Sequence, residues 1–135
     1  KKTQQEAEKP KEYDESLKFG EITNLEVIDE KTGDGAAIKE GDQFKAKYKL
    51  ALSSTGEVIE EGELDLDNYG NPYKLQKPNL IDGWVEGMVG MKAGGVRSLK
   101  VPSDKGYGEA GQGQKIGPNT DLSFRIELTE VIPSQ

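Results

Sequence analysis

Apolar and polar residues alternate in several stretches of the chain. In the clearest stretch, mostly lysines separate the apolar positions Phe44, Ala46, Tyr48, Leu50 and Leu52. A period of two predicts a strand with one buried face and one wet face. Weaker patterns of the same kind predict further strands over residues 22–28, 57–60, 73–76, 96–101 and 122–128.

One stretch follows a different spacing. Its apolar residues recur at helical intervals and include the only tryptophan of the chain: Leu80, Ile81, Trp84, Val85 and Met88. We expect Pro78 and Asn79 to begin this helix and Gly90 to end it. A helix this short is unstable alone in water, so it must pack on the strands. The pattern predicts an α+β fold in which an antiparallel sheet covers one face of a short helix.

Residues 1–20 differ in texture from the rest of the chain. They are rich in Lys, Glu and Gln without apolar periodicity, which predicts a solvated tail or stalk, followed by one folded domain over 21–135. No window of residues 1–135 is long and apolar enough to span a bilayer, and we expect no part of this sequence to insert into a membrane. The stalk-like start favours an extracytoplasmic domain displayed behind a membrane anchor.

Composition excludes several function classes. The net charge is −7 and no cluster of Lys or Arg is present, so we expect no nucleic-acid partner. The absence of histidine and cysteine removes the commonest general base, the commonest metal ligand and the thiolate nucleophile. We therefore expect neither a metal nor a cofactor.

Three motif candidates fail on their context. The spacing G-x-G-x-x-G over 106–111 does not open a helix, as a dinucleotide fingerprint must. The acidic stretch 65–70 resembles the start of a calcium loop, but position twelve of that loop is Gln76 where a bidentate glutamate is required. Glu60 and Glu61 are adjacent on a predicted strand and point to opposite faces, so they do not form a catalytic pair.

Aromatic residues remain as the candidates for function. They are dispersed over several predicted elements: Tyr48, Tyr73, Trp84, Tyr107 and Phe124. The simplest interpretation is a small core. However, Tyr107 lies in a glycine-rich loop, where core packing does not explain the presence of a tyrosine. Loops that present aromatic side chains above a rigid scaffold often form binding surfaces.

The order of these residues resembles the FKBP family of peptidyl-prolyl cis–trans isomerases. The resemblance extends from near Val27 to Ile132 and rests on ordered blocks: Gly33-x-Gly35, Gly41-Asp42 before Tyr48, Gly56-x-x-Ile59-Glu60, Leu80-Ile81-x-Gly83-Trp84-x-x-Gly87-Met88, Val101-Pro102-Ser103-x-x-x-Tyr107-Gly108, and Ile116-x-Pro118-Asn119 followed by Phe124. It implies a half-barrel of antiparallel strands wrapped around the helix, with a shallow apolar pocket between them.

The resemblance also implies roles for individual residues. Trp84 would form the pocket floor, and three aromatic residues would form its walls: Tyr48, Tyr73 and Phe124. Leu80 and Ile81 would line the entrance, with the backbone N–H of Ile81 donating to a bound carbonyl. Tyr107 would reach in from the long loop, with Ile116 beside it.

Two departures from the family pattern stand out. The usual Phe-Asp pair after the Gly56 turn is Ile59-Glu60 here, and the longer glutamate places its carboxylate differently. An alternative alignment puts Leu64-Asp65 in that place but loses the spacing to the turn. Gly117 stands where the family commonly has proline, which should loosen the loop.

The resemblance implies a monomeric isomerase that acts on X-Pro bonds of polypeptides and has macrolide ligands. The departures leave a second hypothesis open, a peptide-binding or chaperone module with weak or no isomerase activity. A third hypothesis is a structural β-domain without either function.

Overall fold

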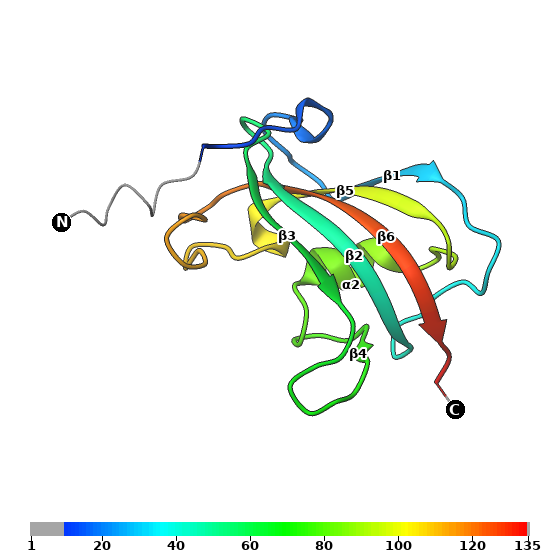
Figure 1. Ribbon diagram of the computed structural model, residues 1–135. Coiled ribbons are helices and arrows are strands. Elements are labelled where there is room, and N and C mark those ends of the chain that lie inside the picture. Colours follow the sequence, from blue (N-terminus) through cyan, green and yellow to red (C-terminus); the bar gives the residue numbers. More distant parts are fainter. Residues whose placement is uncertain (1–9, 135) are drawn as a thin grey trace.

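One antiparallel sheet curves around one α-helix in the computed structural model, which describes residues 10–134 (Figure 1). The strands follow the order β1-β5-β6-β2-β3, and the short β4 pairs with β2. Their bounds are β1 (Glu26–Lys31), β2 (Gln43–Leu52), β3 (Val58–Leu64), β4 (Tyr73–Lys74), β5 (Val96–Val101) and β6 (Leu122–Ile132). The helix α2 spans Asp82–Met88, and two 3-10 turns are η1 (Glu15–Leu17) and η2 (Ser103–Lys105). This arrangement confirms the predicted α+β fold.

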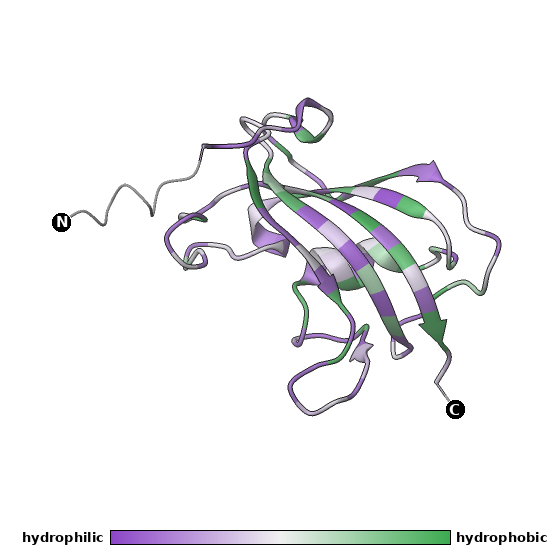
Figure 2. Cartoon of the chain, viewed as in Figure 1, coloured by the Kyte–Doolittle hydropathy of each residue, from purple (hydrophilic) through white to green (hydrophobic). Residues whose placement is uncertain are grey.

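The long strands β2 and β6 form the centre of the sheet. They pair from Gln43↔Ile132 to Leu52↔Leu122, and polar and apolar residues alternate along both (Figure 2). As the spacing predicts, Phe44, Ala46 and Leu50 are buried in the core beneath the helix.

The helix lies close to β5 because two of its residues lack side chains. A Cβ at Gly83 would lie 2.7 Å from Val101 Cγ1, and one at Gly87 would lie 2.8 Å from Leu99 Cδ2. The face that carries Trp84 is buried, as the helical spacing predicts. The expected start was wrong: the N-cap is Ile81 and no side chain caps it, so Asn79 does not serve that role.

The C-terminal end of α2 is held by a side chain from the sheet. Arg97 on β5 is 9% exposed, and its Nη1 donates to the carbonyls of Gly87 at 2.8 Å and Val89 at 3.1 Å. Its Nε donates to Asp29 Oδ1 at 2.7 Å, which links the helix to β1. A cation at this end also complements the helix dipole.

The first strand begins later than expected. The sequence pattern predicts a strand from residue 22, but β1 spans Glu26–Lys31 and its apolar residues Val27 and Ile28 are exposed. Ile22 is buried outside any strand, and its N–H donates to Asp121 Oδ2 at 2.8 Å. Because β1 is an edge strand and all its residues are exposed, its sequence lacks the alternation of buried apolar and exposed polar residues that marks the central strands.

The predicted tail over residues 1–20 is wrong for its second half. Leu17 is fully buried, and its carbonyl accepts a hydrogen bond from Ser123 Oγ at 2.6 Å. Asp14 Oδ2 lies 3.0 Å from Arg125 Nη1 and 3.1 Å from Lys49 Nζ on the outer face of the sheet. This segment thus packs onto β2 and β6, while residues 1–9 lie outside the described part of the chain.

The other edge of the sheet is the acidic strand β3. Glu61 and Glu63 stand opposite Lys49 and Lys47 of β2, and unlike charges across neighbouring strands stabilise the pair. The N–H of Val58 donates to the carbonyl of residue 12 at 2.8 Å, but the sheet order ends with β3. Beyond that first residue, its outer backbone edge has no strand partner within residues 10–134.

Candidate active site

A cleft of about 600 Å³ opens at the N-terminal end of α2. Strands β2, β3 and β6 contribute to its walls, and so does the long loop that follows β5. Seven of the ten site residues proposed from the sequence line it: Tyr48, Glu60, Leu80, Ile81, Trp84, Tyr107 and Phe124. The structure therefore brings together aromatic residues that lie far apart in the sequence.

Trp84 forms the aromatic centre of the cleft and is 5% exposed. Tyr48 and Phe124 meet its ring edge to face, with ring centroids at 5.6 Å and 5.7 Å. Phe44 packs behind it with centroids 6.4 Å apart. Edge-to-face contacts of this kind fix the rings in place, so the cleft has a rigid apolar wall.

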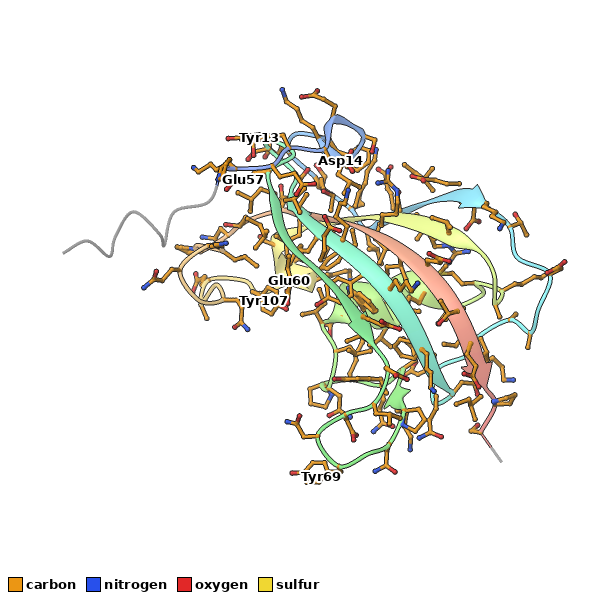
Figure 3. The ribbon with its side chains drawn as sticks, in the orientation of Figure 1. Tyr13, Asp14, Glu57, Glu60, Tyr69 and Tyr107 are labelled. Carbon is orange, nitrogen blue, oxygen red and sulfur yellow. The ribbon has the colours of Figure 1, made fainter. Side chains whose placement is uncertain are left out.

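One edge of the cleft carries two tyrosines around a carboxylate. Burial, with a smaller effect of the Glu60 carboxylate, raises the pKa of Tyr48 to about 12. Burial and Glu60 also raise the pKa of Tyr107, and Figure 3 shows Glu60 and Tyr107 on the same side of the molecule. Both hydroxyls thus remain protonated at neutral pH and act only as neutral hydrogen-bonding groups.

The position of Glu60 bears on the two alignments of the acidic residue. Glu60 lines the cleft, whereas the alternative Asp65 forms an ion pair with Lys45 Nζ at 3.0 Å and does not line it. Leu64 does line the cleft. The Tyr48 ring lies against Gly62 between them, where an added Cβ would meet its hydroxyl oxygen at 3.0 Å.

A backbone donor is available at the mouth of the cleft. Ile81 lines the cleft and precedes the first turn of α2, and its carbonyl accepts from the N–H of Trp84 at 3.0 Å. Among residues 10–134, no acceptor pairs with the N–H of Ile81 itself. This N–H is therefore a candidate donor to the carbonyl oxygen of a bound molecule.

Three proposed residues lie outside the main cleft. Tyr73 borders a second hollow, which shares Asn79 with the main cleft, and its role as a wall of the pocket stays a prediction. Ile59 and Ile116 border a third hollow, which shares Glu60 and Tyr107 with the cleft. The two isoleucines therefore adjoin the aromatic site without lining its main volume.

Sequence reasoning missed other lining residues. They include Leu50, Pro78, Asp82, Asp104 and Gln112. Leu50 follows Tyr48 on the same face of a predicted strand, and that period of two was a signal for it. The loop residues Asp104 and Gln112 gave no local signal, because the fold of the long loop alone brings them to the cleft.

Within the described range 10–134, no group of three or more His, Cys, Asp or Glu side chains is arranged to hold a metal ion. No helix of this range has both the length and the apolar character to cross a membrane. The residues that line the cleft carry aromatic rings, aliphatic side chains, tyrosine hydroxyls, carboxylates and the amides of Asn79 and Gln112.

A family model for FKBP-type peptidyl-prolyl cis-trans isomerases matches residues 35–129. The chain belongs to this family. Among curated FKBP relatives, the FK506-binding protein 2 of Kluyveromyces lactis is 37% identical over 93 residues, which cover 67% of this chain and 64% of the relative. The isomerase FkpA of Escherichia coli strain K12 is 36% identical over 104 residues, covering 76% of this chain and 36% of FkpA.

Solved FKBP structures have the same fold. The crystal structure of AtFKBP13 superposes with a TM-score of 0.66 at 29% identity and covers 83% of this chain and 96% of that one. The structure of FkpA from Escherichia coli superposes with a TM-score of 0.67 at 29% identity, covering 98% of this chain and 56% of FkpA. The chain spans 64% and 36% of the length of the two curated relatives described above.

Proposed function

We propose that this chain is a peptidyl-prolyl cis–trans isomerase that accelerates rotation about X-Pro bonds in polypeptides. The observation that carries the proposal is the cleft lined by Tyr48, Trp84, Tyr107 and Phe124. Ile81 also lines this cleft, and its N–H has no acceptor among residues 10–134. Family membership supports the same activity.

The chemistry of the cleft suits this reaction. Rotation about an amide bond faces a barrier of ~18–20 kcal/mol, and no bond is broken on the way. The twisted amide has lost its resonance and is less polar than the planar one, so an apolar cleft favours the twisted form. No nucleophile, general base or metal is needed.

Individual residues have separate tasks in this proposal. The prolyl ring packs on Trp84, while the Ile81 N–H donates to the carbonyl oxygen of the bound peptide and holds one side of the bond. The free side then rotates against the edge formed by Tyr48 and Tyr107, whose hydroxyls stay neutral.

The relatives suggest a ligand for the same cleft. One of them is named an FK506-binding protein, and we propose that FK506 binds this chain in competition with the peptide. Binding would be followed through Trp84, the only tryptophan of the chain and a lining residue of the cleft.

Protease-free NMR exchange on a short blocked X-Pro peptide tests the activity. We expect the chain to broaden and exchange the cis and trans resonances, and we expect FK506 to suppress this effect. Unchanged exchange rates with a Trp84 fluorescence response to peptide would favour the binding module over the enzyme. If the peptide shows no catalysed exchange and Trp84 fluorescence does not respond to it, only the hypothesis of a structural β-domain without either function would remain.

A further inference from the structure

A second hollow lies beside the aromatic cleft and shares a wall residue with it. It has a volume of about 520 Å³ and is bordered by β4 and by the loop that joins β3 to β4. Asn79 lines both hollows. The two hollows therefore adjoin at Asn79, within reach of one extended polypeptide whose proline lies in the cleft.

The walls of this second hollow are rich in side-chain amides. They come from Gln43, Asn68, Asn71, Gln76 and Asn79. Of these amides, only that of Gln43 has a hydrogen-bond partner within residues 10–134, the carbonyl of Pro72 at 3.4 Å. The other four are exposed, and each offers one acceptor and two donor hydrogens. An extended backbone presents the complementary N–H and C=O groups whatever its side chains are.

The loop between β3 and β4 is held in one shape from within. Asp67 Oδ1 accepts hydrogen bonds from the backbone N–H groups of Tyr69 at 2.9 Å and Asn71 at 3.0 Å. The N–H of Asp67 donates to the carbonyl of Asn71 at 2.7 Å, and Leu66 and Pro72 form a bridge at the base of the loop. A loop organised before binding loses little entropy when a ligand arrives.

This organised loop presents a tyrosine to solvent. Tyr69 lines the second hollow, is 87% exposed and lies at the tip of the loop, away from the body of the sheet (Figure 3). Its ring adds nothing to the core. A large aromatic side chain displayed on a structured loop is instead suited to contact another molecule.

We propose that the second hollow, together with Tyr69, binds the backbone of an extended polypeptide whose proline occupies the cleft. The proposal rests on the proposed isomerase function and adds a dependence on substrate length. A chain that extends beyond the cleft gains amide and tyrosine contacts that a short peptide cannot reach. The site thereby favours unfolded polypeptides over isolated X-Pro units, with no preference for particular side chains along the extension.

The test compares a peptide of about five residues with peptides of about fifteen, each residue spanning ~3.3 Å, extended on either side of one proline. We expect kcat/KM to be higher for one of the long peptides, and that peptide identifies the direction of binding. Tyr69→Ala should lower kcat/KM for it on the order of three- to tenfold and leave the short peptide unaffected. Tyr13→Ala is the matched control, because Tyr13 is 53% exposed and lies at the opposite end of the molecule (Figure 3).

Three results would overturn the proposal: equal kcat/KM for short and long peptides, equal losses on both peptides in Tyr69→Ala, or the same loss in Tyr13→Ala. A readout without turnover separates this proposal from the isomerase function. The side-chain amide resonances of Asn68 and Asn71 should shift with the long peptide and not with the short one. If exchange is absent while these shifts occur, the isomerase function fails and the docking site stands. If the resonances do not move, the docking site fails.

Discussion

Replacing Arg97 by methionine should destabilise the domain strongly while sparing the chemistry of the cleft. The substitution keeps the unbranched stem and removes the guanidinium. Hydrogen bonds to charged groups contribute about 1.5–3 kcal/mol each, and Arg97 donates two of them to the end of α2. The half-exposed pair with Asp29 adds at most about 1 kcal/mol.

The expected loss is smaller than the sum of these contributions. Val89 is 45% exposed, so water can replace the guanidinium at its carbonyl, whereas the bond to the Gly87 carbonyl is buried. We therefore expect a loss of about 2–4 kcal/mol in the free energy of unfolding. For a domain of this size that corresponds to a decrease of roughly 8–16 °C in Tm.

Chemical denaturation and calorimetry would measure the loss, with Lys100→Met as the control on the same strand. Lys100 Nζ lies 3.4 Å from Glu26 Oε1 and 4.8 Å from the ring centroid of Phe19, and removing these partly exposed contacts should cost about 1 kcal/mol or less. Well below its Tm, Arg97→Met should keep kcat/KM for a short peptide within about twofold, because Arg97 does not line the cleft. Equal Tm decreases for both variants would refute the role assigned to the guanidinium.

Three further predictions concern the cleft, the helix contact and acid stability. Trp84→Leu should lower kcat/KM on the order of tenfold, because it removes the ring that contacts Tyr48 and Phe124, and Trp84→Phe should lower it by less. Equal exchange rates for Trp84→Leu and wild type by NMR would contradict this. Gly83→Ala should cost about 1–3 kcal/mol in denaturant unfolding despite the better helix propensity of alanine, because the stiff Val101 side chain must move; a stabilised variant would disprove the close contact. The backbone N–H groups of Ser134 and, to a smaller extent, Lys39 lower the pKa of Asp42. The ionised carboxylate therefore stabilises the fold above pH about 4, and this contribution is lost as the pH falls through the pKa that Asp42 has in the folded protein. In Asp42→Asn, the free energy of unfolding should fall less steeply with decreasing pH below about 4 than in wild type. An unchanged slope would contradict the stabilising role of the Asp42 carboxylate.

The local pattern predicted the elements whose burial follows a regular period. The strand of Tyr48 and the helix of Trp84 each place apolar residues on one face, and both faces are buried in the structure. The pattern did not predict the packing of residues 12–20, because the burial of Leu17 depends on Ser123, which lies 106 residues further along the chain. No short window of sequence contains such a contact.

The candidate site divides in the same way. Residues on regular elements, such as Tyr48, Trp84 and Phe124, line the cleft, since the face of a strand or helix fixes their direction. Tyr73 borders the adjoining hollow, and its position depends on the two-residue strand β4 and on the loop before it. The roles assigned to individual residues in the reaction remain predictions for the variants above.

An outer strand whose backbone groups face solvent can take up a segment of another polypeptide as an extra strand of the sheet. The outer strand β3 carries this exposure, and its acidic residues, among them Glu60, Glu61 and Glu63, surround the unpaired backbone groups with charge. Charge on an edge strand discourages strand addition and aggregation. The acidic residues of β3 therefore disfavour the addition of a further strand at this edge of the sheet.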